Sequence, residues 1–215
     1  GKTRIGVIRV VTLADEKLIG AHGEILRKYF PCMDPLSYCI PDQPLGVYDE
    51  KTEIAAAPKV AELAKRLERE GCKVIIISCA GDPGIDLARQ QVKVPVIGAG
   101  SAAGLLARAL GRKVGVIGIT AEVPRVMKEV LGEQFAGYGK PDGVQTTLDL
   151  QESEAKSAVI RAAENLAGRG AEVIALGCTG MSTAGLVADI HRATGLPVID
   201  PVYAAGLVAA AIVNC

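Results

Sequence analysis

The chain has 215 residues, and its 24 basic and 24 acidic side chains give a formal net charge of zero. This length accommodates one large domain or two domains of about 100 residues each. Aromatic residues make up only 3% of the chain and Trp is absent, so we expect a core of small aliphatic side chains. Because no basic cluster stands out, we expect neither a nucleic-acid partner nor an anionic membrane surface.

The sequence shows no export signal, which would combine a charged start, an apolar stretch and a cleavage site. Its longest apolar run, 204–213, is shorter than the roughly 20 residues of a membrane-spanning helix. We therefore expect a soluble, cytoplasmic protein. The six cysteines are then expected to be free thiols rather than a disulfide framework. Their spacing, with only two histidines beside them, does not indicate a metal site.

Short β-branched runs bounded by Gly or Pro predict buried strands. In chain order these runs are 4–11, 73–78, 94–97, 113–119, 172–177 and 196–199, with weaker strands near 36–40 and 144–148. Helical patterns occupy the segments 58–70, 101–110, 152–168 and 203–213. Gly71 and Gly170 are predicted to cap two of these helices at their C-termini. Strands that alternate with helices predict parallel sheets covered on both faces.

The second half of the chain repeats the first half. Three pairs of segments match in the same order, namely 5–11 with 114–120, 71–79 with 170–178, and 95–107 with 197–209. Such a repeat indicates an internal duplication. We predict an α/β fold of two pseudo-symmetric, doubly wound domains, each with a roughly four-stranded parallel sheet and with the active site in the cleft between them. The last helix has no following strand and is expected to return to the first half. The predicted domains are therefore 1–98 plus 203–215, and 99–202.

Each copy of the repeat ends a strand with a cysteine, Cys79 in the first half and Cys178 in the second. Ligands bind at the carboxyl ends of parallel strands. Asp82 and Pro83 are predicted to begin a helix, whose N-terminus would lower the pKa of the nearby thiol. Two thiols that face each other could remove a proton from one face of a carbon and deliver one to the other. Simple packing is the alternative role, but Gly-containing turns after both cysteines favour catalysis.

The residues around both cysteines resemble the motifs of hydantoin racemases, which belong to the aspartate/glutamate/hydantoin racemase superfamily. The first motif is Ser-Cys-Ala-Gly-Asp-Pro-Gly at 78–84, followed by Pro-Val-Ile-Gly at 95–98, and the second is Leu-Gly-Cys-Thr-Gly-Met at 176–181. The resemblance extends over most of the chain. It implies proton transfer by two thiols, without cofactor or metal, at a carbon between an amide-type nitrogen and a carbonyl of a small-molecule substrate. Ala-rich helices would also permit a homo-oligomer.

The resemblance carries Cys79 and Cys178 over as the two acid/base groups. It also implies that the substrate lies against the neighbouring loops and strand ends. The substrate-binding residues expected there are Val11, Thr12, Ala80, Gly81, Asp82, Thr120, Thr179 and Gly180. Backbone N–H groups and the hydroxyl of Thr179 are expected to stabilise an enolate-like charge, as an oxyanion hole does.

Two segments depart from the pattern of the family. Residues 9–12 read Arg-Val-Val-Thr where hydantoin racemases often have Asn-Pro-Asn, and residues 43–48 lack the usual Gly-Pro and Ser-Ile-Glu. Both loops would touch the substrate, so these departures concern the substrate more than the reaction. The Asp-Pro-Gly after the first cysteine resembles the hydantoin branch, which implies a 5-substituted hydantoin or a related amino-acid derivative. A free aspartate- or glutamate-type amino acid is the alternative, for which Arg9 could supply a cation. A one-cysteine decarboxylase of the superfamily is disfavoured by the presence of both thiols. A two-lobed binding protein without catalysis is the alternative of another class.

Overall fold

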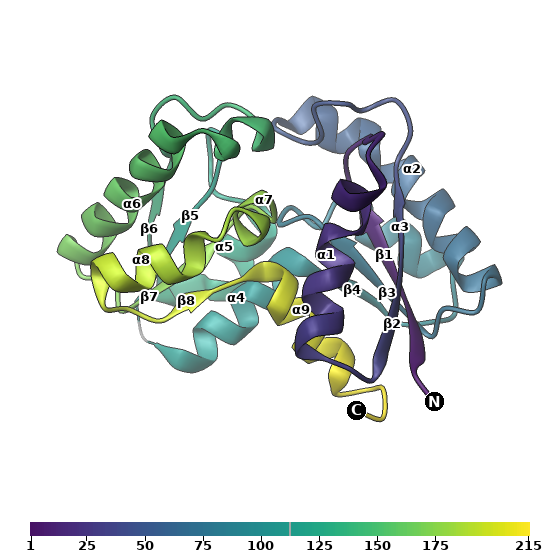
Figure 1. The fold of residues 1–215 in the computed structure, drawn as a ribbon. Helices are drawn as coiled ribbons and strands as arrows, with labels where there is room; N and C mark the ends of the chain where they lie inside the picture. Colours follow the sequence, from purple (N-terminus) through teal and green to yellow (C-terminus); the bar gives the residue numbers. More distant parts are fainter. Residues whose placement is uncertain (112) are drawn as a thin grey trace.

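The structure is a computed structural model that describes residues 1–111 and 113–215. It forms two lobes, each built around a parallel sheet (Figure 1). The first sheet consists of β1 (Thr3–Arg9), β2 (Met33–Cys39), β3 (Val74–Ser78) and β4 (Val96–Gly98). The second sheet consists of β5 (Val114–Ile117), β6 (Phe135–Gly139), β7 (Val173–Leu176) and β8 (Val198–Ile199). The strand orders β2-β1-β3-β4 and β6-β5-β7-β8 are equivalent, which confirms the predicted α/β fold with two four-stranded parallel sheets.

Helices cover both faces of each sheet. They are α1 (Glu16–Tyr29), α2 (Glu50–Arg69), α3 (Ile85–Gln91), α4 (Ala99–Leu110), α5 (Arg125–Leu131), α6 (Ser153–Gly168), α7 (Gly180–Thr183), α8 (Leu186–Thr194) and α9 (Pro201–Ala210). One apolar layer joins both sheets through α1, α4, α5 and α9. Separate outer layers lie under α2 and α3, and under α6 and α8. Among the helices described here, none combines the length and apolar character needed to cross a membrane.

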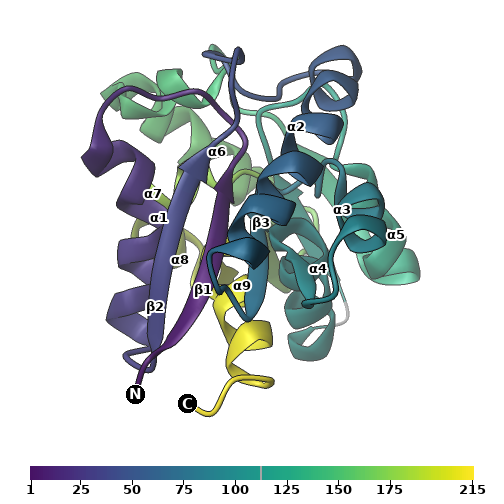
Figure 2. The same ribbon diagram turned by 90° about the vertical axis from the view of Figure 1, so that its right-hand side faces the viewer.

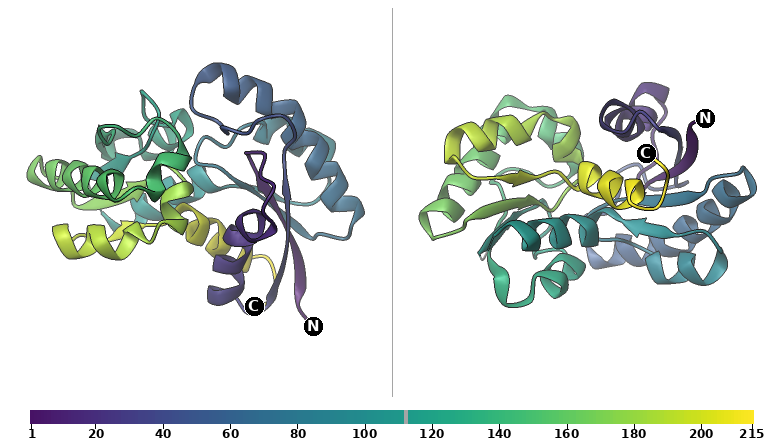
Figure 3. Two further views of the ribbon diagram at one scale, coloured as in Figure 1. Left: turned by 45° about the horizontal axis from the view of Figure 1, so that its top comes forward. Right: turned by 90° about the horizontal axis from the view of Figure 1, so that it is seen from below.

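The last helix, α9, lies beside α4 in the middle of the molecule and also contacts α1, β3 and β4 of the first lobe (Figure 3). A Cβ atom at Gly206 would lie only 2.3 Å from the ring of Phe30, so glycine lets α9 approach the end of α1 closely. The two ends of the chain lie near each other at the base of this lobe (Figure 2). These contacts agree with a last helix that returns to the first half. The domain boundaries 1–98 plus 203–215 and 99–202 themselves remain a prediction.

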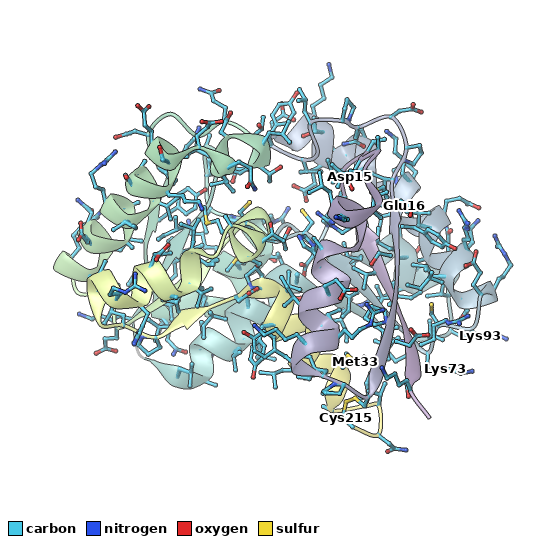
Figure 4. All side chains as sticks on the ribbon, in the orientation of Figure 1. Asp15, Glu16, Met33, Lys73, Lys93 and Cys215 are labelled. Atoms are coloured by element: carbon cyan, nitrogen blue, oxygen red, sulfur yellow. A yellow bond between two sulfur atoms is a disulfide. The ribbon has the colours of Figure 1, made fainter. Side chains whose placement is uncertain are left out.

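Cys32 and Cys215 form a disulfide, with their Cα atoms 5.1 Å apart. Figure 4 shows Cys215 close to Met33, at the end of the first lobe that carries both chain ends. The expectation that all cysteines are free thiols is therefore wrong for this pair. Because 183 residues separate the two positions in sequence, only the return of α9 to the first lobe brings them together.

The strand predicted near 144–148 is wrong, because its place in the sheet is taken by β6. Residues 147–151 instead form a 3-10 helix. Strand β6 reads Phe-Ala-Gly-Tyr-Gly, which contains no β-branched residue and two glycines, Gly137 and Gly139, so the sequence pattern does not indicate a strand. They are needed because Leu166 of α6 packs against them, 3.2 Å and 3.4 Å from the positions where a Cβ would stand.

Helix α2 is longer than the sequence indicates. It begins at Glu50 rather than at Pro58, with a reciprocal capping box between Asp49 and Thr52. Pro58, the first residue of the predicted helix, lies inside the observed one. The C-terminal glycines are as predicted, since Gly71 and Gly170 have φ angles of 89° and 97° and directly follow the capping residues of α2 and α6.

Candidate active site

A cavity of about 810 Å³ lies at the carboxyl ends of the central strands and is lined by both lobes. Eight of the ten predicted site residues line it, namely Cys79, Cys178, Val11, Ala80, Gly81, Thr120, Thr179 and Gly180. The other two, Thr12 and Asp82, are absent from the described lining and have structural partners instead. Thr12 donates its hydroxyl to Ile40 O at 2.6 Å, which fastens the loop behind the cavity wall.

The two cysteine loops touch each other directly. Cys79 follows β3 immediately, and Cys178 lies two residues beyond β7. The hydroxyl of Thr179 donates to the main-chain oxygen of Ser78 at 3.2 Å, across 101 residues of sequence. The duplication therefore brings both thiols to one cavity, as the repeat predicted.

Asp82 caps a different helix from the one predicted. Its carboxylate accepts hydrogen bonds from the N–H groups of Gly100 at 2.7 Å and Ser101 at 3.1 Å, in the first turn of α4. The adjacent helix α3 begins only at Ile85, after Gly84 in a left-handed conformation. The predicted helix start at Asp82 is wrong because its side chain, 4% exposed, turns inward to satisfy the orphan N–H groups of α4.

Burial raises the pKa of the Cys79 thiol to about 12. The N–H of Gly81 opposes this shift, whereas negative charge on Cys178, Asp82 and Glu53 adds to it. The expectation that a helix N-terminus lowers the pKa of this thiol is therefore wrong. Loss of hydration outweighs one N–H donor, so the thiol is protonated at neutral pH.

Burial also raises the pKa of the Cys178 thiol, to about 11. Two N–H groups, of Gly180 and Met181, oppose the shift here. These donors and that of Gly81 interact with the sulfur atoms, so they stabilise thiolates in the unliganded protein. The family resemblance implies that the N–H groups of Gly81 and Gly180 stabilise the enolate oxygen. In that role these N–H groups would leave the sulfur atoms and bind the substrate oxygen instead.

Two buried polar residues, Arg9 and His22, line the same cavity. His22 is 2% exposed, and its Nδ1 lies 2.7 Å from the hydroxyl oxygen of Ser78, the residue before Cys79. Burial, with the charge of Arg9, holds the pKa of His22 well below 6.5, so the ring is neutral. His22 is not among the predicted site residues, because it lies on α1, which is absent from the predicted helices, and because it has no partner in the repeat.

The loops that depart from the family pattern reach the cavity. Val11 of the first loop lines it, as do Gly46, Val47 and Tyr48 of the second. Acidic side chains from α2 and from the loop before α5 lie around them. The ionisable groups on this part of the lining are Asp49, Glu50, Glu53, Glu122 and Arg125. Across residues 1–111 and 113–215, no group of three or more His, Cys, Asp or Glu side chains is placed to hold a metal ion.

The family model of Asp/Glu/Hydantoin racemases matches residues 33–209 of this chain. A hydantoin racemase from Rhizobium meliloti is 31% identical over 183 residues, covering 80% of this chain and 73% of that relative. The structure of allantoin racemase from Klebsiella pneumoniae superposes with a TM-score of 0.81 at 27% identity, covering 98% of this chain and 87% of that protein.

Glutamate racemase from Thermus thermophilus shares the fold, with a TM-score of 0.67 at 22% identity over 98% of this chain and 80% of that protein. The residues matched by the family model include both cysteine motifs. This chain therefore belongs to the Asp/Glu/hydantoin racemase family and is an isomerase of the racemase type.

Proposed function

We propose that this protein is a cofactor-independent racemase that inverts the acidic carbon of 5-substituted hydantoins or related amino-acid derivatives. The observation that carries the proposal is the pair of thiols, Cys79 and Cys178, on touching loops of a duplicated fold around one cavity. The volume of about 810 Å³ suits a small molecule of this class. The similarity of this chain to hydantoin and allantoin racemases supports a substrate of the hydantoin class.

In the proposed reaction one cysteine acts as a thiolate and the other as a thiol. The thiolate takes the hydrogen of the acidic carbon as a proton, and the electron pair of that C–H bond moves onto the adjacent carbonyl oxygen. The opposite thiol then delivers its proton to the other face of the carbon. The product has inverted configuration, and the two cysteines have exchanged their protonation states. The reverse reaction uses the same groups in exchanged roles.

Cys178 is the better candidate for the thiolate of the resting enzyme. Two N–H groups oppose the increase in its pKa, whereas only one does so for Cys79. The negative charges of Asp82 and Glu53 also add to the increase in the pKa of Cys79. Since each thiolate would repel the other, the pair loses its protons in two coupled steps. At neutral pH the form with one thiol and one thiolate is therefore a small fraction of the protein, and this fraction increases as the pH rises.

The proposal is tested by exchange of the Cα hydrogen in D2O, followed by NMR together with optical rotation. The substrates are single enantiomers of 5-methylhydantoin, allantoin, aspartate and glutamate. We expect exchange and loss of optical rotation with a hydantoin or allantoin. Cys79→Ser and Cys178→Ser should each lose racemisation, whereas Cys39→Ser, which changes a thiol outside the cavity, should retain it.

Each outcome has a distinct meaning. Exchange only with aspartate or glutamate would contradict the hydantoin assignment and keep the two-thiol mechanism. Racemisation that survives both serine substitutions would contradict the mechanism. Binding of a hydantoin without any exchange would contradict the proposed reaction and favour a non-catalytic binding protein.

A further inference from the structure

Arg9 places a positive charge against the cavity without a carboxylate to balance it. The side chain is 8% exposed at the end of β1. Its Nη1 donates to the main-chain oxygens of Leu18 and Ile19 in α1. Among the ion pairs of the described residues, none involves Arg9. Since an unpaired buried cation is strongly unfavourable, an anion supplied from outside the chain is expected to pair with it.

Two buried nitrogen atoms beside the cavity lack a partner among the described residues. They are Nε of Arg9 and Nε2 of His22, and both side chains line the cavity. When the hydroxyl of Ser78 donates to Nδ1 of the neutral ring, Nε2 carries the ring proton. Each of these two side chains on the cavity lining then carries an N–H donor without an acceptor among the described residues. A carboxylate supplies acceptor oxygens for both donors and the missing negative charge.

This wall lies next to one of the reacting thiols. Arg9 is paired in register with Ser78, and Cys79 is the next residue. Neighbouring strands are about 4.8 Å apart, so the main chain of Arg9 lies directly beside the start of the Cys79 loop. Both side chains also line the same cavity. The group that Arg9 recognises therefore belongs to the substituent of the inverted carbon rather than to a remote part of a long substrate.

The acidic residues on the cavity lining would disfavour a bound carboxylate, in contrast to Arg9. Glu50 and Glu53 are both exposed, and they would repel an anion at the α2 side of the cavity. Charge interactions are weaker in solvent than in the interior, so the buried cation dominates at its own position. Glu53 can instead accept hydrogen bonds from the N–H groups of a hydantoin ring. The cavity is thus polarised, with a cation on the α1 side and carboxylates on the α2 side.

We propose that Arg9 and His22 bind a carboxylate on the substituent of the inverted carbon, so that the substrates are hydantoins with an acidic side chain. This inference rests on the proposed racemase function. A primary amide of the same shape lacks the negative charge, and in place of one acceptor oxygen it presents an NH2 group. A site built from N–H donors therefore discriminates against it.

The test compares hydantoin-5-acetic acid with its primary amide as substrates for racemisation. For the unaltered protein we expect kcat/KM to be about 10- to 100-fold higher for the acid, the range of a charged hydrogen bond. Arg9→Gln should reduce this ratio to about one, and Arg9→Lys should keep part of it because the charge remains. The ratio is the readout because a general loss of folding lowers both rates together.

Arg125→Gln is the matched control. It also removes a positive charge from the cavity lining, but its side chain is 91% exposed and paired with Glu129. We expect the ratio of acid to amide to survive this change. Equal use of both compounds by the unaltered protein would overturn the proposal. So would an equal fall of both rates in Arg9→Gln, since Arg9 would then only tie β1 to α1.

Calorimetric binding of the same two compounds separates this inference from the proposed reaction. Binding of the acid that depends on Arg9, without racemisation of either compound, would retain the carboxylate site and overturn the racemase proposal. Racemisation of both compounds with no preference in binding would retain the racemase and overturn the carboxylate site. Absence of both binding and racemisation would overturn both proposals.

Discussion

The two cysteine loops hold equivalent places in the repeat but differ in what surrounds each sulfur. After Cys178 the chain enters the short helix α7 at once, and two N–H groups face the thiol. After Cys79 the chain makes a turn through Asp82, which has a φ angle of 49°, and only one N–H group faces the thiol. The residue before Cys79 is Ser78, tied to His22, whereas Gly177 precedes Cys178 and has no side chain to tie.

This difference shows that the duplication placed two thiols in one cavity without making them equal. Equivalent positions on equivalent strands fix where each sulfur lies. The pKa of each thiol depends on local N–H donors and on charges such as Asp82, which later sequence change alters independently in each half. In the proposed reaction the two directions therefore use different proton donors and acceptors.

The largest expected effect comes from removing one thiol at a time. Cys79→Ala and Cys178→Ala should each reduce racemisation by about 10²- to 10⁴-fold, because one face of the carbon loses its acid/base group. Each variant should still exchange the hydrogen of one enantiomer in D2O, and the two variants should favour opposite enantiomers. NMR of both enantiomers measures this. Exchange of the same enantiomer by both variants would show that the thiols do not face opposite sides.

The next effect concerns the packing behind the Cys79 loop. A Cβ atom at Gly100 would lie 1.8 Å from the main-chain oxygen of Ala80, so Gly100→Ala must displace this loop. We expect a loss of about 3 kcal/mol in the free energy of unfolding. Gly180→Ala in the other loop meets only side chains of Thr147 and Leu150 at 3.1 Å and should cost about 1 kcal/mol. Urea unfolding compares the two variants, and equal losses would contradict the difference in packing.

The pH dependence of the reaction should reflect the raised pKa values of both thiols. At neutral pH the pKa of Cys178, about 11, leaves little thiolate, and each unit of pH increases that fraction about tenfold. We expect kcat/KM to rise with pH between about 7 and 9. Glu53→Gln removes one negative charge that raises the pKa of Cys79, so it should shift mainly the direction in which Cys79 is the base. A flat profile in both directions would contradict the raised pKa values.

The smallest expected effect concerns the lowered pKa of the buried His22 ring. The pKa of His22 lies well below 6.5 in the folded protein and near 6.5 in the unfolded chain, so the unfolded state takes up the proton first. Stability from this group is present above pH 6.5 and is lost as the pH falls. From pH 6.5 to 5.5 the unaltered protein should lose about 1 kcal/mol more than His22→Gln. Parallel pH dependences in urea unfolding would show that the ring titrates normally.

The sequence predicted much of this architecture because the repeat and the aliphatic strands are local patterns. The two sheets, the caps at Gly71 and Gly170, and the convergence of Cys79 and Cys178 on one cavity follow from such patterns. Strand β6 was not predicted, because Gly137 and Gly139, against which Leu166 packs, give it a weak β pattern. Its existence depends on packing against α6, which no local signal encodes.

The sequence by itself determined the duplication, the strand ends that carry the two thiols, and hence the chemistry available between them. Only the tertiary structure decided that Asp82 caps α4 and that Cys32 joins Cys215. It also decided that Arg9 is buried beside the cavity, with no ion pair among the described residues. The physical reason is the range of each interaction. Strand and turn signals act over a few residues, whereas a pKa, a long-range cap or an unpaired charge depends on groups that folding brings together from distant parts of the chain.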